Sequence, residues 1–331
     1  MTLSPTSAQT PAARWALALT EIPSVTGTPD EAGFAERLAA MLRASPAFAG
    51  DPEAVWTIPV PGGLPGRACV CALLRGRGPR TVVLTGHFDT VHVADYGDLA
   101  PLACRPFALA PALAAKLRER ASTEAERRAR DDLAGSDFLP GRGLLDMKAG
   151  LAAGLATIEA AARDPGRDGN LLFLAVPDEE VNSAGARAAA PELAGIAARH
   201  GLEIAAAINL DALVDDGDGT IGRAVALGTI GKLLPSALVV GRAVHASDAY
   251  AGLNAAAIAG ALAVDLEWSQ ELGERTGDEV TSGVSLLGMK DGKRAYDVTT
   301  PERVWMFWNL MVQRRSPTEI LSEVQRLARA S

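Results

Sequence analysis

Four apolar, strand-like segments of the sequence end in histidine or carboxylate side chains, and this repeated pattern is what most constrains the fold. The segments are residues 81–85, 141–145, 171–176 and 205–210, which run into His87 with Asp89, Asp146, residues 178–180 and Asp211, respectively. Because ligands bind at the carboxyl ends of strands in open α/β sheets, we expect these side chains to meet at one edge of a sheet. Imidazole nitrogen and carboxylate oxygen together suit zinc and similar divalent ions. The pattern therefore predicts a two-metal hydrolase.

Composition narrows the classes of partner and compartment. The chain has 331 residues, which is long enough for two domains, and a formal net charge of -8. That charge argues against a nucleic-acid partner, because such proteins present a basic face. The sequence has no run of 18 apolar residues, so no membrane span is expected. Its three cysteines are too few for a disulfide framework, and we expect buried thiols and a cytoplasmic location.

Helical and strand patterns organise the chain into two domains. Helices are expected over residues 11–20, 28–42, 110–134, 148–162, 191–200 and 253–264, with two more beginning at Thr300 and Ser316. Further strands are expected near residues 54–60, 67–75, 223–228, 236–244 and 280–287. An acidic loop at residues 215–219 marks a boundary. We therefore expect an α/β domain over residues 1–222, followed by an α+β domain over residues 223–331.

Local signals fix several helix starts. Thr28 with Glu31, and Ser316 with Glu319, are spaced as capping boxes, in which each side chain bonds to the other residue's backbone N–H. Pro191 is expected in the first turn of its helix.

The acidic side chains each have a structural alternative. Asp146 could cap the helix that follows it, Asp211 could end its strand in a turn, and residues 178–180 could form a solvated acidic turn. Three adjacent carboxylates at the end of an apolar strand repel one another unless a cation neutralises them, which favours metal binding. Adjacent side chains point in different directions. One of Glu179 and Glu180 would therefore bind metal, while the other takes a proton from metal-bound water.

The histidines divide into one expected ligand and three others. His87 is the expected ligand, because Asp89 can orient its imidazole. His92 is expected in the core or at the rim of the domain, and His200 in a structural role in the last turn of a helix. His245 is by default a packed or surface residue.

Three motifs together resemble the M20 metallopeptidase family. They are Gly-His-Phe-Asp-Thr-Val at residues 86–91, Gly-Arg-Gly through Asp-Met-Lys at residues 141–148, and Pro-Asp-Glu-Glu with Gly-Ala at residues 177–186. The insert that begins at residue 94 and the segments 228–235 and 296–302 resemble the arginine-utilisation (RocB-type) branch of that family. The resemblance covers nearly the whole chain. It implies a catalytic α/β domain, with a mixed sheet flanked by helices, and an inserted α+β lid and dimerisation domain.

The resemblance also implies a set of metal ligands. His87 and Asp211 would bind one divalent ion, Asp146 would bridge, and Glu180 would bind the second ion. Zinc is the expected metal, with cobalt and manganese as alternatives.

Amide hydrolysis is the activity that the resemblance implies. A metal-bridged hydroxide would attack the carbonyl of an N-acyl amino acid or small peptide. Glu179 would act as general base and acid, and Asp89 would orient the metal-binding His87. His245, reaching the site across a homodimer formed through the lid, would stabilise the oxyanion, and Asn254 would bind substrate. The implied context is arginine or amino-acid catabolism.

One part of the family pattern is not matched. The family's second metal takes a further histidine from a C-terminal segment, and no histidine follows His245 in this sequence. We therefore expect a truncated catalytic domain, incomplete at its C-terminal end, and a second metal site that lacks one ligand. Two other interpretations stay open. One is a catalytically incomplete protein that acts only as a binding or dimerisation module. The other is a single-metal hydrolase that uses His87, Asp146 and Asp211.

Overall fold

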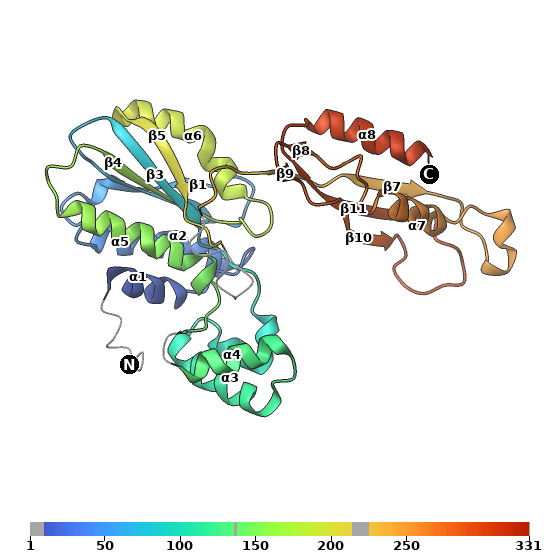
Figure 1. The fold of residues 1–331 in the computed structure, drawn as a ribbon, viewed down its shortest axis with the longest axis horizontal. Coiled ribbons are helices and arrows are strands. Elements are labelled where there is room, and N and C mark those ends of the chain that lie inside the picture. The colour runs from blue at the N-terminus through green and yellow to red at the C-terminus, as the bar shows by residue number, and fades with distance from the viewer. Residues whose placement is uncertain (1–9, 136–137, 214–224, 331) are drawn as a thin grey trace. The chain divides into compact units, whose positions relative to one another are not determined.

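The computed structural model describes residues 10–135, 138–213 and 225–330 (Figure 1). The chain divides into two compact units, Met1–Thr220 and Ile221–Ser331, and each is considered by itself. The acidic loop at residues 215–219 and the expected boundary at residue 222 lie outside the described residues. None of the described helices is both long enough and apolar enough to cross a bilayer.

A mixed five-stranded sheet forms the centre of the first unit. Its strands are β1 (Val55–Pro59), β2 (Ala68–Leu74), β3 (Arg80–His87), β4 (Asn170–Val176) and β5 (Glu203–Asn209), in the order β1-β2-β4-β3-β5. Strand β3 is parallel to both β4 and β5, whereas β1 and β2 run antiparallel to their neighbours. The carboxyl ends of β3, β4 and β5 therefore share one edge of the sheet, as the sequence predicts.

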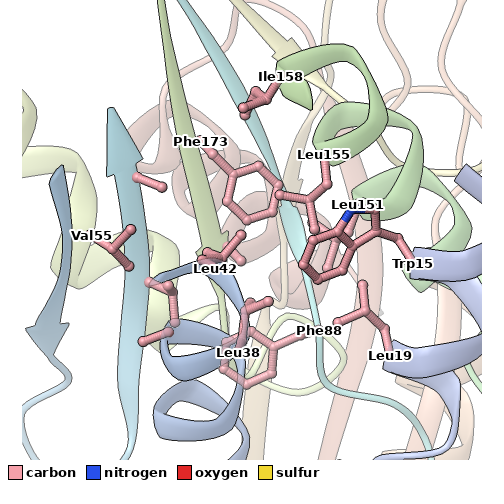
Figure 2. Packing of buried hydrophobic residues seen from close by; sticks show 14 of the residues in the cluster. Trp15, Leu19, Leu38, Leu42, Val55, Phe88, Leu151, Leu155, Ile158 and Phe173 are labelled. Carbon is pink, nitrogen blue, oxygen red and sulfur yellow. The ribbon is translucent and has the colours of Figure 1, made fainter. Parts of the chain in front are cut away.

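Helices cover both faces of this sheet. On one face α1 (Pro11–Thr20), α2 (Pro29–Ala44) and α5 (Gly150–Ala162) enclose the core around Phe173 (Figure 2). On the other face α6 (Ala184–His200) packs on Cys69, Cys71 and Leu73 of β2. Because side chains alternate along a strand, the two cysteines share one face, and both thiols are buried and unpaired as expected. The expected α/β class with a mixed, helix-flanked sheet is confirmed.

Two helix starts differ from their expected form. Thr28 caps α2 by accepting from Glu31 N, but the Glu31 side chain accepts from Gly27 N instead of closing the capping box. Helix α6 begins at Ala184, and Pro191 lies inside it and not in its first turn. The earlier start is stabilised because the Asp178 carboxylate accepts from Ala184 N at 3.0 Å.

The segment before Asp146 is not a strand. It forms a π-helical turn, η4 (Leu144–Ala149), that runs directly into α5. Gly143 takes a left-handed conformation with φ of 74°, which glycine adopts at low cost, and its carbonyl accepts from Lys148 N at 2.9 Å. This bond closes the turn, so a continuous extended segment cannot form there.

The insert between β3 and η4 contains two longer helices, where the sequence predicts one. A short helix, η3 (Ala94–Leu102), precedes α3 (Pro106–Arg120) and α4 (Glu124–Ala134). The break after α3 follows from a capping box between Thr123 and Glu126, which starts α4.

The second unit has an antiparallel sheet with helices on one face. Strand β11 (Arg303–Val312) pairs with β10 (Ser285–Asp291) along one edge. Along its other edge it pairs with β7 (Ser236–Val240) and β6 (Gly231–Leu233). Helices α7 (Ala255–Leu266) and α8 (Pro317–Ala330) pack on the buried side of β11. The remaining short elements are η2 (Pro52–Ala54) in the first unit, with η5 (Ala246–Ala251), β8 (Arg275–Thr276) and β9 (Glu279–Val280) in the second.

The largest error of the sequence analysis falls on β11. The apolar run after Thr300 was expected to be helical, but it is a strand whose even-numbered residues are buried and whose odd-numbered residues are more exposed. The prediction of a strand at residues 223–228 is also wrong. Within the part of this segment that the structure describes, which begins at residue 225, the chain has no regular structure up to residue 230. The predicted capping box of Ser316 and Glu319 is confirmed.

Candidate metal centre

Four segments meet at the carboxyl edge of the first sheet. His87 ends β3, residues 178–180 follow β4, Asp211 follows β5, and Asp146 lies in η4. Two glycines of α5 allow this approach. A Cβ at Gly150 would lie 1.9 Å from the carbonyl oxygen of Leu210, and one at Gly154 would lie 2.7 Å from that leucine's side chain. The start of α5 therefore packs against the end of β5, which brings Asp146 and Asp211 to the same imidazole.

The imidazole of His87 is the centre of this cluster. Its Nε2 lies 3.0 Å from Asp146 Oδ1, 3.8 Å from Glu179 Oε2 and 3.9 Å from Asp211 Oδ2. One ligand atom each from His87, Asp146 and Glu180 lie within 4.8 Å of one another. The histidine side chain is buried, whereas the carboxylates around it are open to solvent. The group can therefore be reached by an ion or a small molecule.

The other ring nitrogen of His87 faces Asp89. Its Nδ1 lies 3.0 Å from the backbone carbonyl oxygen of Asp89 and 3.6 Å from Oδ1 of the carboxylate. A carbonyl oxygen only accepts hydrogen bonds, so Nδ1 carries a proton, and Nε2 is the nitrogen that faces the carboxylate cluster. A metal ion would bind at Nε2 in place of the proton that Nε2 shares with the carboxylates, while Nδ1 keeps its proton.

The Asp89 carboxylate is completely buried and has its own partners. It accepts from Glu179 N at 3.1 Å, from Glu180 N at 3.2 Å and from Thr26 Oγ1 at 2.8 Å. Burial by itself would raise the pKa of Asp89, but hydrogen bonds with His87, the backbone and Thr26 lower it overall. An ionised Asp89 thus fixes the backbone of the two glutamates that follow β4.

The electrostatics of the cluster call for a cation. Burial works to lower the pKa of His87, but the surrounding carboxylates, with Asp89 foremost, raise it to about 9. Burial raises the pKa of Glu179 above its ordinary value, with Asp211 adding to the effect. Burial likewise raises the pKa of Glu180, and Asp146 adds to it. Neighbouring carboxylates contribute to each of these shifts, and a divalent ion would neutralise their charge.

The donor set fits such an ion. Zinc binds imidazole nitrogen and carboxylate oxygen at about 2 Å, so ligand atoms of one ion lie a few ångström apart, as those of His87 and Asp146 do. Asp211 lies at the same imidazole, and each carboxylate has a second oxygen, so donors for a second ion are also present.

Buried neighbours fix the backbone beneath the cluster. His87 N donates to Met147 Sδ at 3.0 Å, and a Cβ at Gly86 would collide with the Met147 side chain. Lys148 is fully buried, donates to the carbonyl of Ile22 at 2.8 Å, and lies over the ring of Phe34. Burial lowers the pKa of Lys148 to about 8.

Sequence reasoning did not identify three residues next to this site. Thr26 contacts the Asp89 carboxylate, and Arg67 forms ion pairs with Glu31 and with Asp178. Glu31 was read only as a capping residue, and Arg67 follows a glycine-rich turn that carries no pattern of its own. Only the three-dimensional contacts reveal these roles.

Two of the other histidines lie outside the cluster. His92 is exposed and pairs with Asp95 at 3.0 Å, so of its two expected places, core or rim, the core is excluded. His200 ends α6, and its ring stacks on Trp56, in agreement with a structural role.

Two candidate residues belong to the second unit. His245 is exposed, and its Nδ1 accepts from Ser247 N at 3.2 Å. Asn254 is half-buried and caps α7, with its Oδ1 accepting from Ala256 N at 2.9 Å. Within their own unit both side chains therefore have local backbone partners.

Sequence comparisons identify related proteins. Residues 83–271 match the model of peptidase family M20/M25/M40, which is more than half of the chain. The uncharacterized protein YqjN of Bacillus subtilis (strain 168) is 34% identical over 303 residues, which cover 91% of this chain and 54% of YqjN. Protein RocB of the same strain is 30% identical over 309 residues, which cover 92% of this chain and 53% of RocB. The chain thus spans about half the length of the curated relatives it matches.

A solved structure with a similar fold is the M20 family metallo-carboxypeptidase Sso-CP2 from Sulfolobus solfataricus. The two match with a TM-score of 0.64 and 14% sequence identity, over 96% of this chain and 75% of that chain. At this identity the likeness shows a shared fold.

Proposed function

The chain belongs to peptidase family M20/M25/M40, and we propose that it is a metal-dependent hydrolase that cleaves the amide bond of an N-acyl amino acid or small peptide. One observation carries this proposal. His87, Asp146 and Glu180 present ligand atoms within 4.8 Å of one another, with Glu179 Oε2 3.8 Å from the same imidazole. Ligands and a proton carrier at one sheet edge are what metal-assisted hydrolysis requires.

The ligand roles follow from position. His87 would bind through Nε2, because its Nδ1 proton faces the Asp89 carbonyl. Asp146 and Asp211 present oxygens on the same side of that imidazole, with Asp146 nearer and suited to bridge. Glu180 would bind the second ion. Zinc is the proposed metal, with cobalt and manganese as alternatives.

The chemistry divides between the ions and the chain. Divalent ions, when bound, would activate water and polarise the substrate carbonyl. Glu179 would take the proton of the attacking water on its carboxylate and pass it to the leaving amine. Its raised pKa and half-exposed side chain suit a group that must carry a proton near neutral pH. Asp89 would keep the Glu179 backbone in place through its hydrogen bond to Glu179 N.

Residues of the second unit would complete the substrate site. The Ser247 backbone N–H can only donate, so it gives Nδ1 of His245 the acceptor role and places the proton of the neutral ring on Nε2. The Nε2–H of His245 would stabilise the developing oxyanion. Asn254 uses its carbonyl oxygen for the helix cap, which leaves its amide N–H groups to bind substrate.

The decisive test is Glu179→Gln, assayed against a panel of N-acetyl amino acids and dipeptides. Loss of the proton carrier should lower kcat by about 10²- to 10⁴-fold while metal content is unchanged. Glu192→Gln, at an exposed position of α6, is the matched control and should keep full activity. Undiminished activity of the Glu179 variant would contradict the proposed mechanism.

Metal content separates the alternatives. Elemental analysis of the dialysed full chain should find two ions per chain if the proposed centre forms. A single ion would favour a one-metal hydrolase that uses His87, Asp146 and Asp211. No bound ion would favour a protein that acts only as a binding or dimerisation module.

The second unit, which we assign to residues 223–331, would serve as the lid and form a homodimer. Trp305 and Leu238 are paired across β11 and β7, and their side chains are 48% and 62% exposed. Exposed apolar side chains grouped on one face are typical of a protein interface. A role in arginine or amino-acid catabolism is proposed from the resemblance of the insert and of segments 228–235 and 296–302 to the arginine-utilisation (RocB-type) branch. The three cysteines without a disulfide suit the proposed cytoplasmic location.

A further inference from the structure

Arg67 is a buried cation that joins two buried carboxylates from distant segments. It lies directly before β2, and its Nη2 donates to Glu31 Oε2 at 2.7 Å while its Nη1 donates to Asp178 Oδ1 at 3.3 Å. The side chains of Arg67, Glu31 and Asp178 are only 9%, 0% and 7% exposed. Contacts that are shielded from water in this way restrict the position of both partners.

Asp178 sets the conformation of the turn that contains Glu179 and Glu180. Its backbone is left-handed, with φ of 66°, a conformation that a non-glycine residue keeps only when its surroundings impose it. Its Oδ2 accepts from Ala184 N at 3.0 Å, and its Oδ1 faces Arg67. The next two backbone N–H groups then point at the Asp89 carboxylate.

Glu31 makes the corresponding connection on the other side of Asp89. Its Oε2 also accepts from Gly27 N at 2.8 Å, and the neighbouring Thr26 hydroxyl donates to Asp89 Oδ2 at 2.8 Å. Arg67 therefore holds both segments that bond to Asp89. Together with the peptide links Gly27–Thr26 and Asp178–Glu179, these contacts form a closed ring that begins and ends at Arg67.

We propose that Arg67 is a positioning residue that fixes Glu179 and Glu180 at the metal centre by holding Asp178 against Glu31. This inference rests on the proposed function of the centre. The planar guanidinium of arginine can donate to two carboxylates at once in fixed directions, which the single ammonium of lysine cannot reproduce.

A second arginine in the same unit shows what a merely stabilising pair looks like. Arg14 Nη2 contacts both Glu159 oxygens, at 3.0 and 2.8 Å, and Trp15 Nε1 also donates to Glu159. That pair links α1 to α5 and contacts none of the residues at the centre. By contrast, Arg67 Nε and Glu31 Oε1 are buried without a hydrogen-bond partner among the described residues, so their arrangement does not maximise bonding.

The test compares Arg67→Met with Arg14→Met in the full chain. Both variants should lower the urea midpoint, because each removes the arginine from a buried carboxylate. Hydrogen exchange of the metal-free proteins should separate them. With the amides of β4 as the internal reference, the Glu179 and Glu180 amides of the Arg67 variant should exchange at least about tenfold faster than in the wild type. In the Arg14 variant these amides should exchange at the wild-type rate. Co²⁺ affinity should fall by about 10- to 100-fold in the Arg67 variant, the usual cost of losing a residue that orients metal ligands.

Arg67→Lys is the companion variant, in case the methionine protein fails to fold. It keeps the charge and should show a smaller loss in the same direction. Wild-type exchange at both amides together with wild-type Co²⁺ affinity, in a variant that has lost stability, would overturn the inference and leave Arg67 a structural residue. If the wild type binds no Co²⁺, the proposed function fails, but the exchange measurement still decides the role of Arg67.

Discussion

The two sheets of this protein bury their residues in different ways. Strands β2 and β4 of the first unit are buried on both faces along nearly their whole length, whereas β11 of the second unit is fully buried on one face only. Along β2 and β4 a charged side chain can therefore reach solvent only beyond the end of the strand, as Glu179 and Glu180 do after β4. In the second sheet one face stays open, and it carries aromatic residues such as Trp305. Polar strand ends thus indicate a chemical site, and exposed apolar faces indicate a binding surface.

Two tryptophans of β11 test this contrast most strongly. Trp308 is 1% exposed and packs in the core with α7 and α8. Trp305 is 48% exposed, and its ring is tilted against that of Phe307, with the ring centroids 4.7 Å apart. Trp308→Ala should lower the free energy of unfolding by about 3–5 kcal/mol, because it leaves a large cavity in a packed core. Trp305→Ala should cost about 1 kcal/mol or less. Urea unfolding of both variants measures the difference.

Two further measurements serve as controls for the comparison of Trp308 with Trp305. Trp308→Phe should cost much less than the alanine variant, since the Trp308 Nε1 has no hydrogen-bond partner among the described residues and its loss breaks no bond. Sedimentation should show Trp305→Glu shifted toward the monomer if the open face forms the proposed homodimer. Equal costs for Trp305→Ala and Trp308→Ala would contradict the assignment of one buried and one open face.

Binding of a metal ion at the carboxyl edge of the first sheet should raise the free energy of unfolding. At a free ion concentration about 100 times the dissociation constant, binding should add about 2.7 kcal/mol to the free energy of unfolding, and a chelator should remove it. His87→Ala should abolish this gain, because the imidazole is the nitrogen donor of the cluster. His92→Ala, at an exposed histidine paired with Asp95, is the matched control and should keep the gain. An unchanged response in the His87 variant would place metal binding elsewhere.

The first sheet was predictable because its pattern is local. Each apolar run is long enough to be a strand, and parallel strands bring their carboxyl ends to one edge. The sequence therefore placed His87, Glu179 and Asp211 near one another without any knowledge of the packing. The cysteines of β2 were predictable for the same reason, since alternation along a strand assigns each side chain to a face.

The errors arose where packing overrides local pattern. The run at β11 contains eight apolar residues, at positions 304–308 and 310–312, with only Asn309 between them, so its periodicity does not distinguish a helix from a strand. Pairing with β7 and β10 on its two sides decides for the strand. Likewise, Glu31 matches a capping box, but its carboxylate accepts from Gly27 N and from the buried Arg67 and not from Thr28 N. No pattern within a short window contains that partner.

The smallest effect is expected at Glu274. Like Asp89 in the first unit, this carboxylate of the second unit accepts hydrogen bonds from backbone N–H groups. Glu274 accepts from Gln313 N, Arg314 N and Arg315 N at 2.8–3.1 Å. Burial works to raise the pKa of Glu274, but these hydrogen bonds lower it below its ordinary value of 4.5. A lowered pKa means that the unfolded chain binds the proton first as the pH falls. The stabilisation by Glu274 is therefore fully present above pH 4.5 and is lost as the pH falls through the lowered pKa. In urea unfolding of metal-free protein, the difference in stability between wild type and Glu274→Gln should be constant near neutral pH and should shrink below pH 4.5. A difference that grows on acidification would show that these N–H groups do not favour the ionised carboxylate.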